Sequence, residues 1–222
     1  MDWAAFNLSV QLGTATLALL LPLSLAVGRA LAMYRFVGRG AVEALIALPL
    51  VLPPTVLGFY LLRGFGNRSP VGQLFASLSG HSLAFSFEGL VLASVIVNLP
   101  FAVQPIQRAF ENVPLDLREA AACCGMSPWR TLVTVEFPLA WPGIVTAAIL
   151  TFAHTLGEFG VVLMVGGNIP AETRTLSIAI YDRMQAFDDR AAGVMAATLL
   201  LLALVTLAAT NALARRIGRG RG

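Results

Sequence analysis

Five apolar segments of about membrane-spanning length constrain the fold of this 222-residue chain more than any other feature. A helix that crosses the hydrocarbon core of a bilayer needs about 20 mostly apolar residues. Such a helix also satisfies its own backbone hydrogen bonds, which lipid cannot do. We therefore predict an all-α integral membrane protein with about five transmembrane helices, folded as one domain over residues 1–222. The predicted spans are residues 6–27, 41–62, 89–110, 142–165 and 191–214.

The composition supports a membrane location and argues against an enzyme. Charged residues make up 12% of the chain, about half of their usual share in soluble domains. All 15 basic residues are arginines, so the chain lacks the lysine with which a P-loop binds phosphates. The adjacent Cys123 and Cys124 offer neither a disulfide framework nor a metal-binding spacing. We expect no catalytic residues, no metal site and no cofactor.

The distribution of arginines predicts the orientation of the chain, because cytoplasmic loops carry an excess of basic residues. Ten arginines fall on one side of the predicted spans and five on the other. The larger group, which we place in the cytoplasm, is Arg29, Arg35, Arg39, Arg108, Arg118, Arg130, Arg215, Arg216, Arg219 and Arg221. The smaller group is Arg63, Arg68, Arg174, Arg183 and Arg190. This places the N-terminus outside and the C-terminus in the cytoplasm.

Both ends of the chain fit this orientation. Met1 and Asp2 supply no basic region, so we expect the first segment to be a retained span rather than a cleaved signal peptide. The basic C-terminal end follows a span directly, so we expect it to contact anionic lipid rather than nucleic acid. The arginine-, alanine- and leucine-rich composition is typical of a GC-rich bacterial genome. We therefore expect a multi-pass protein of the bacterial inner (plasma) membrane.

The polar stretch 114–138, between the third and fourth spans, predicts two short helices joined by a turn. Asp116 is the expected N-cap of the first helix, with Glu119 completing a capping box. Gly125 is the expected left-handed stop. Three alanines, at positions 120–122, give this first helix a smooth face on which another protein could rest. A docking structure and an ordinary interfacial loop both fit this capping pattern.

The second short helix has equally clear boundaries in the sequence. Ser127 is the expected N-cap, and Pro128 suits the first helical position. Pro138 is expected to end this helix, because proline disrupts a regular helical interior. The two helices would then form a compact unit on the cytoplasmic side.

The same stretch resembles the "EAA" motif of ABC importer permeases. Glu119-Ala120-Ala121 is followed by three residues and Gly125, and then by nine residues and Val135-x-Phe137-Pro138. The family pattern has isoleucine and leucine where this chain has valine and phenylalanine. In that family the motif forms a coupling helix that sits in a cleft of a separate ATPase subunit. The resemblance implies that the ATPase-coupling residues are Asp116, Glu119, Ala120, Ala121, Gly125, Ser127, Pro128 and Arg130.

Two further segments are similar to molybdate permeases of this family, namely residues 48–62 and 156–181. Sulfate/thiosulfate and tungstate permeases share parts of these patterns, so these cargoes remain alternatives. The resemblance implies the membrane subunit of an ATP-driven oxyanion importer. It also implies two copies of an ATPase subunit, an extracytoplasmic oxyanion-binding protein and a homodimer of this chain in the lipid bilayer. It implies no nucleic-acid partner.

Helix-breaking and polar residues fall at a similar depth in three of the predicted spans, which is typical of a transport path. Proline and glycine are also frequent in ordinary transmembrane helices, and His154 could simply be a packing residue. A carboxylate at position 158 would repel an oxyanion, so we expect Glu158 to pair with an arginine, such as Arg174, or with a backbone amide. The candidate pathway or gate residues are Pro53, Pro54, Asn98, Pro100, His154, Gly157 and Glu158.

The outer loops are expected to form the landing surface for the binding protein, with Arg63, Arg68 and Arg174 as candidate contacts. Two other classes of function remain as alternatives. In the first, an intramembrane enzyme would use His154 and Glu158 as an acid–base pair, but no nucleophile or metal-ligand pattern accompanies them. In the second, an ion-coupled secondary transporter would use Glu158 as its proton carrier, which leaves the coupling motif unexplained.

Overall fold

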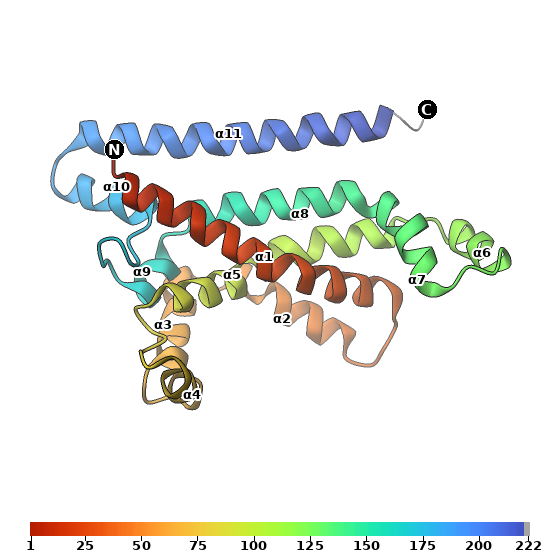
Figure 1. The fold of residues 1–222 in the computed structure, drawn as a ribbon, viewed down its shortest axis with the longest axis horizontal. Helices are drawn as coiled ribbons and strands as arrows, with labels where there is room; N and C mark the ends of the chain where they lie inside the picture. Colours follow the sequence, from red (N-terminus) through yellow and green to blue (C-terminus); the bar gives the residue numbers. More distant parts are fainter. Residues whose placement is uncertain (220–222) are drawn as a thin grey trace.

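The computed structural model describes the backbone of residues 1–219 and the side chains of residues 1–208. Arg221 lies outside the described residues, and so do the side chains of Arg215, Arg216 and Arg219. Within the described part, four long helices run along one axis (Figure 1). These helices are α1 (Trp3–Met33), α5 (Phe87–Glu111), α8 (Phe137–Gly157) and α11 (Asp189–Arg219).

The core of the bundle lies between α1, α5 and α8, with α5 the most enclosed of the long helices. Ile106 and Phe110 of α5 pack against Ala140 and Ile144 near the end that carries α6 (Leu115–Cys123). Small residues allow the helices to approach closely, as in other membrane bundles. A Cβ atom on Gly143 of α8 would collide with the Cβ atom of Ala109.

The predicted second span, residues 41–62, is not one straight helix. It consists of α2 (Arg39–Val51) and α3 (Pro54–Phe65), which meet at an angle of 111°. The break follows from the two consecutive prolines, because a residue before proline is driven out of the helical conformation. Leu52 and Pro53 accordingly have ψ angles of 135°. Pro53 and Pro54 therefore end one helix and begin another.

The predicted fourth span, residues 142–165, does not coincide with a single helix. The helical segment begins at Pro128 and continues to Gly157, and Pro138 does not end it. A π-helical turn, η1 (Leu132–Glu136), precedes Pro138. This wider turn relieves the clash between the proline ring and the carbonyl group four residues earlier. At the other end the chain breaks at Glu158, and a separate short helix, α9 (Gly160–Gly166), follows.

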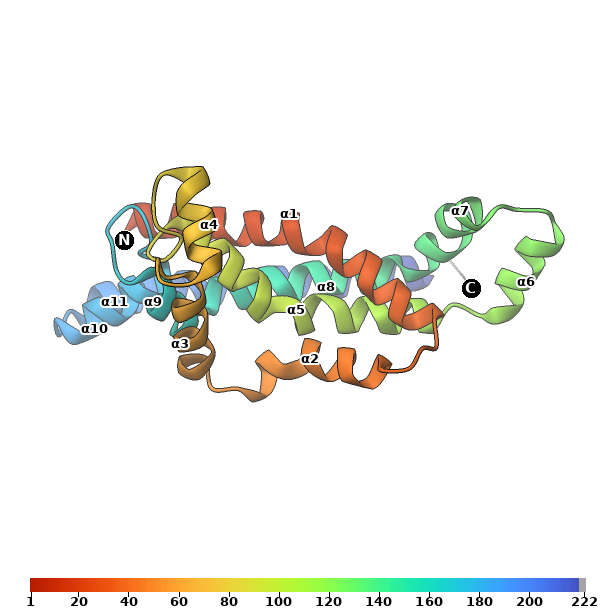
Figure 2. The same ribbon diagram turned by 90° about the horizontal axis from the view of Figure 1, so that it is seen from below.

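The two ends of the bundle carry different structures. One end carries α6 and α7 (Pro128–Thr131), which project beyond the long helices (Figure 2). The other end carries the N-terminus, α4 (Pro70–Ser79) and α10 (Leu176–Gln185) (Figure 1). By residue position, the described arginines of the two predicted groups lie on elements at opposite ends.

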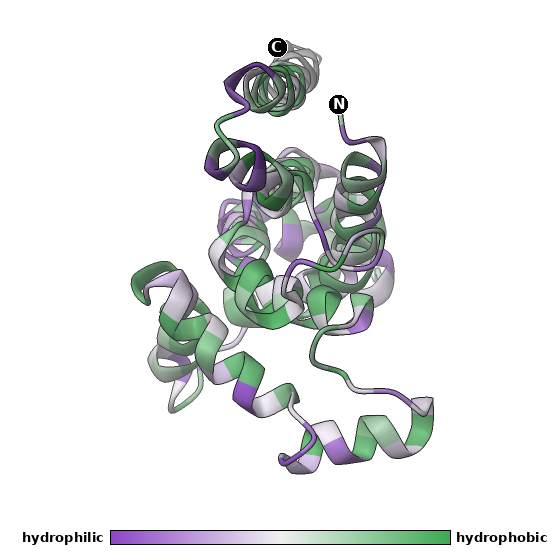
Figure 3. Cartoon of the chain, turned by 90° about the vertical axis from the view of Figure 1, so that its left-hand side faces the viewer, coloured by the Kyte–Doolittle hydropathy of each residue, from purple (hydrophilic) through white to green (hydrophobic). Residues whose placement is uncertain are grey.

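Apolar residues make up much of the helices of the bundle (Figure 3). Leu45 and Val51 of α2 and Leu200 of α11 are examples of exposed large apolar side chains. Four described helices are long and apolar enough to cross a membrane, and the bent α2–α3 pair would make a fifth span. The prediction of an all-α membrane protein with about five spans is confirmed.

Candidate functional site

The first candidate site is the projecting loop formed by α6 and α7. Helix α6 ends in a Schellman motif, in which the Met126 amide donates to the Ala121 carbonyl at 3.0 Å and the Gly125 amide donates to the Ala122 carbonyl at 2.9 Å. Gly125 has a φ angle of +71°, a left-handed conformation that other residues adopt only with strain. The prediction that Gly125 ends this helix is confirmed.

The start of the second short helix also agrees with the sequence. Ser127 is its N-cap, and the Ser127 hydroxyl accepts a hydrogen bond from the Arg130 amide at 3.3 Å. Pro128 occupies the first helical position. Together, the left-handed glycine and this cap hold the two helices at a defined turn.

The predicted start of α6 was wrong. The helix begins at Leu115 directly after Pro114, and Asp116 therefore lies inside the first turn instead of capping it. Pro114 has an extended ψ angle of 135°, so it lies outside the helix and the first turn begins with the next residue. Asp116 and Glu119 consequently form no capping box, although a carboxylate in the first turn still interacts favourably with the helix dipole.

Most residues of the resembled motif are exposed to solvent, which is compatible with docking. The exposed members are Asp116, Glu119, Ala120, Gly125, Ser127, Pro128 and Arg130. Ala121 differs, because it is buried within the chain. The expected smooth face of three alanines is therefore reduced to Ala120 and Ala122.

Sequence reasoning missed the apolar side chains of this loop. Three exposed apolar side chains lie on the short helices α6 and α7 rather than on the long helices: Leu115, Leu117 and Trp129. Exposed large apolar side chains are available for contact with a protein or a membrane surface. The signal in the sequence is their occurrence beside charged residues in a stretch too polar to span a bilayer.

A buried carboxylate joins this loop to the bundle. Glu136, the last residue of η1, has a side chain that is 5% exposed. Its Oε2 atom accepts a hydrogen bond from Arg29 Nε at 2.8 Å, and its Oε1 atom lies 3.4 Å from Arg118 Nε. Arg118 Nη2 also donates to the Phe110 carbonyl oxygen at 2.7 Å. Sequence reasoning did not single out Glu136, whose signal is a lone acid between Val135 and the Phe-Pro pair.

The second candidate site is a polar cluster between α5 and α8. The buried Asn98 donates through Nδ2 to the Ser94 carbonyl oxygen at 2.8 Å and to Thr155 Oγ1 at 3.1 Å. The Ser94 carbonyl oxygen can only accept, so it must face the amide nitrogen of Asn98. The amide oxygen, Oδ1, then faces His154 Nδ1, 3.1 Å away. His154 therefore donates from Nδ1. This cluster brings together two of the predicted pathway residues, Asn98 and His154.

Glu158 lies at the break between α8 and α9. Its Oε1 atom accepts a hydrogen bond from the Val161 amide at 3.0 Å, and its Oε2 atom lies 3.9 Å from His154 Nε2. The backbone-amide partner expected for this carboxylate is therefore present. Arg174 instead lies in the loop before α10, where its Nε atom donates to Asn168 Oδ1 at 2.6 Å and lies 3.5 Å from Asp182 Oδ2.

A cavity of about 200 Å³ brings parts of three predicted breaks together. Pro54, Phe101, His154 and Glu158 contribute to its lining, and the imidazole of His154 stacks on the Phe101 ring with centroids 4.1 Å apart. Asn98 contacts His154 from outside the cavity lining. The remaining predicted residues flank it: Pro53 precedes α3, Pro100 is buried in α5, and Gly157 is the last residue of α8.

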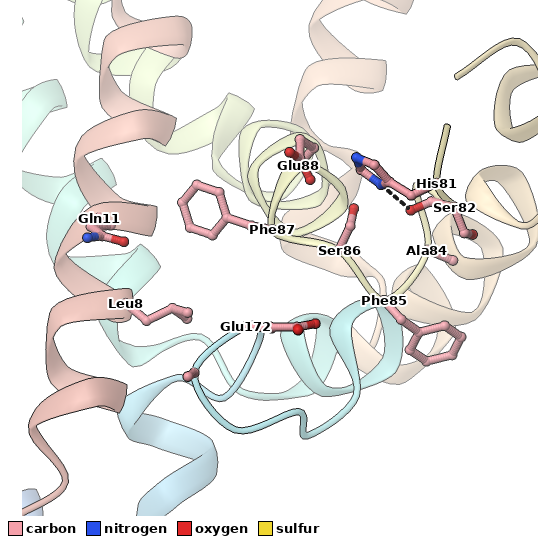
Figure 4. Close-up of a pocket in the computed structure, with 11 residues that line it drawn as sticks. Leu8, Gln11, His81, Ser82, Ala84, Phe85, Ser86, Phe87, Glu88 and Glu172 are labelled. Atoms are coloured by element: carbon pink, nitrogen blue, oxygen red, sulfur yellow. Dashed lines mark hydrogen bonds between the residues drawn. The ribbon is translucent and has the colours of Figure 1, made fainter. Parts of the chain in front are cut away.

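The end of the bundle opposite α6 carries separate basic and acidic regions. Arg63 and Arg68 border one hollow between α3 and α4. A second hollow, of about 690 Å³, has Glu88 and Glu172 on its border and lies between α1, the start of α5 and the loop after α9 (Figure 4). The third predicted docking residue, Arg174, lies in neither hollow and is paired with Asp182.

The comparisons with known proteins agree on the class of this chain. Residues 20–219 match the family described as "Binding-protein-dependent transport system inner membrane component". The chain is 49% identical over 206 residues to the molybdenum transport system permease protein ModB of Azotobacter vinelandii, covering 93% of this chain and 91% of that protein. It is 36% identical over 182 residues to the probable sulfate transport system permease protein cysT of Chlorella vulgaris, covering 82% and 68%.

A solved structure shows the same fold at lower identity. A chain of the bacterial alginate ABC transporter, in complex with its alginate pentasaccharide-bound periplasmic protein, has a TM-score of 0.76 at 17% identity, covering 96% of this chain and 78% of that chain. The long apolar helices define a multi-pass membrane protein. The chain belongs to the family of binding-protein-dependent transport system inner membrane components. The resemblance to ABC importer permeases seen in the sequence is confirmed.

Proposed function

We propose that this chain is the permease subunit of an ATP-driven importer that moves molybdate into the cytoplasm. The observation that carries the proposal is the 49% identity to a ModB permease over 93% of the chain. The chain contains no lysine from which a standard P-loop could be built. In this proposal the permease itself is not an enzyme, and separate ATPase subunits, two per transporter, hydrolyse ATP.

The ATPase subunit docks on the projecting loop. Exposed Glu119 and Arg130 offer charged contacts, and exposed Leu115 and Trp129 offer apolar ones. The left-handed turn at Gly125 and the cap at Ser127 support this role, because a docking element must keep its conformation while the bound ATPase moves. The remaining motif positions contribute the rest of the docking face. Ala121 is the exception, because its side chain is buried within the chain.

The loop end of the bundle faces the cytoplasm, and the end with α4 and α10 faces outward. The excess of arginines on elements at the loop end supports this orientation. An extracytoplasmic oxyanion-binding protein then lands on the outer end, where Arg63 and Arg68 border one hollow and Glu88 and Glu172 another. Arg174 contributes less directly, since its charge is already paired with Asp182.

The translocation path passes the cavity beside His154. Pro54, His154 and Glu158 line this cavity. Asn98 lies outside the lining and orients the imidazole of His154 through a hydrogen bond. Pro53, Pro100 and Gly157 act by breaking or bending the helices that form its walls. One copy of the chain leaves apolar side chains of α2 exposed, including Leu45 and Val51. A second copy packed there, as a homodimer, would complete the walls of the path.

Two measurements test this proposal. Co-purification with the partner ATPase subunit should succeed for the wild-type chain and fail for Glu119→Arg, because a reversed charge disturbs docking. Uptake of labelled molybdate should require ATP and should be competed more strongly by unlabelled molybdate than by sulfate. Undiminished association and transport in Glu119→Arg would count against the assigned role of the loop.

A second cargo has specific support, because the sulfate permease of Chlorella vulgaris is 36% identical to this chain. Molybdate, tungstate and sulfate are tetrahedral dianions, so a weak polar passage discriminates poorly among them. The binding protein selects the cargo in this scheme. Stronger competition by sulfate than by molybdate or tungstate would identify a sulfate importer with the same architecture.

A further inference from the structure

Glu136 is a carboxylate buried where the α6–α7 loop meets the helix bundle. Its side chain is 5% exposed, and those of Arg29 and Arg118 are 27% and 20% exposed. Arg29 Nε lies 2.8 Å from Glu136 Oε2, and Arg118 Nε lies 3.4 Å from Glu136 Oε1. Separating Glu136 from both arginines would leave a buried charge uncompensated, which is costly.

The residues of this ion-pair joint, Arg29–Glu136–Arg118, belong to different elements. Arg118 lies in α6, and Arg29 lies near the end of α1. Glu136 ends the π-helical turn that continues directly into α8. Arg118 also holds the Phe110 carbonyl oxygen near the end of α5, at 2.7 Å. One charged joint thus connects the exposed coupling loop to three long helices of the bundle.

The π-helical turn gives the joint a fixed place on α8. The Phe137 amide donates to the Leu132 carbonyl, five residues earlier, and Pro138 follows without an amide hydrogen of its own. Turns of this kind occur frequently at functional sites. Because Pro138 disfavours a regular turn here, the sequence itself holds Glu136 in the widened segment.

We propose that Glu136 is the positioning residue through which displacement of α6 reaches α1 and α8. This inference rests on the proposed function, because an ATPase must move α6. When the ATPase shifts α6, Arg118 carries Glu136 and the start of α8 with it, and Arg29 passes the same displacement to α1. Without the charge on residue 136, α6 follows the ATPase while the long helices lag behind. ATP is then hydrolysed without a matching amount of transport.

The test uses the complete transporter, with ATPase and binding protein, in proteoliposomes. Uptake of labelled molybdate and release of phosphate are measured together. Glu136→Gln preserves the shape of the side chain but removes its charge, and it should lower molybdate uptake per ATP about tenfold, a typical size for an allosteric coupling. Arg118→Gln should lower the same ratio, and Arg118→Lys, which keeps the charge, should restore part of it.

Arg108→Gln is the matched control at the same end of the bundle. Arg108 is 80% exposed and lies 3.4 Å from Glu111. Exposed ion pairs contribute little, so this variant should keep the wild-type uptake per ATP. A purely structural role for Glu136 predicts less assembled transporter with an unchanged ratio, which separates stability from coupling.

Each outcome bears on a separate claim. Suppose the wild type is active and molybdate uptake per ATP is unchanged in Glu136→Gln and Arg118→Gln. The ion-pair joint then does not transmit the displacement of α6, and the proposed function stays intact. Absence of ATP-dependent uptake by the wild type overturns the proposed function instead. If Glu136→Gln fails to fold, the comparison of Arg118→Gln with Arg118→Lys decides, because both retain the Arg29–Glu136 pair.

Discussion

Asn98 Oδ1 lies 3.1 Å from His154 Nδ1, and this contact joins α5 to α8 beside the polar cavity. Asn98 also fills its two amide hydrogen bonds inside the protein, with the Ser94 carbonyl and the Thr155 hydroxyl. A buried polar side chain that is fully paired in this way holds two helices in a single register. The cluster therefore has a structural role that does not depend on which cargo passes the cavity.

Asn98→Leu should lower the free energy of unfolding by about 1–3 kcal/mol, because it leaves buried partners without hydrogen bonds. Thermal unfolding of the purified chain in detergent measures this change. Ser94→Ala is the control, since the Ser94 hydroxyl makes only long contacts of 3.3 and 3.4 Å. Equal stability of Asn98→Leu and wild type would contradict the assigned role of the cluster.

Gly143→Val should destabilise the bundle, because a Cβ atom there meets the Ala109 Cβ atom and lies 3.1 Å from the Pro105 carbonyl oxygen. Overpacking of a close helix contact costs about 1–3 kcal/mol. Gly64→Ala in α3 is the matched control, because a Cβ atom there meets no other atom within 4 Å. The melting temperature should fall for Gly143→Val and stay level or rise for Gly64→Ala.

Gly125→Ala should weaken binding of the ATPase to the α6–α7 loop without unfolding the bundle. Alanine in the left-handed conformation costs about 1–2 kcal/mol, and the Schellman motif of α6 depends on that conformation. Binding of the ATPase should weaken about tenfold while the melting temperature of the membrane domain changes little. An affinity equal to that of wild type would show that docking does not depend on this turn.

Glu158→Gln distinguishes the importer from a proton-coupled transporter. Glutamine keeps the oxygen acceptor for the Val161 amide, so the start of α9 should survive. ATP-driven uptake should remain within about threefold of wild type, because the proposed role of Glu158 needs no proton transfer. Glu158→Ala removes the acceptor and should cost about 1 kcal/mol, as for a lost helix cap. Complete loss of transport in Glu158→Gln would instead favour Glu158 as a proton carrier.

Local signals in the sequence predicted local structure well. Gly125 ends α6 and Ser127 begins α7, because the conformation of each depends on a few neighbouring residues. The break at Pro53-Pro54 was predictable for the same reason, but its angle of 111° was not. That angle depends on packing between distant segments, such as the close approach of Gly58 in α3 to Met164 in α9.

Non-local contacts account for what the sequence did not reveal. Glu136 pairs with Arg29, 107 positions earlier, and no pattern within either segment indicates that they meet. Pro138 was expected to end a helix, yet the π-helical turn before it lets the helix continue. Asp116 was expected to cap α6, but Pro114 sets an earlier start.

The most direct test of the account is the energy source for molybdate uptake by the reconstituted transporter. Uptake should stop when ATP is withheld from the cytoplasmic side, and it should persist when an uncoupler collapses the proton gradient. Uptake that proceeds without ATP and disappears with the proton gradient would contradict the central claim.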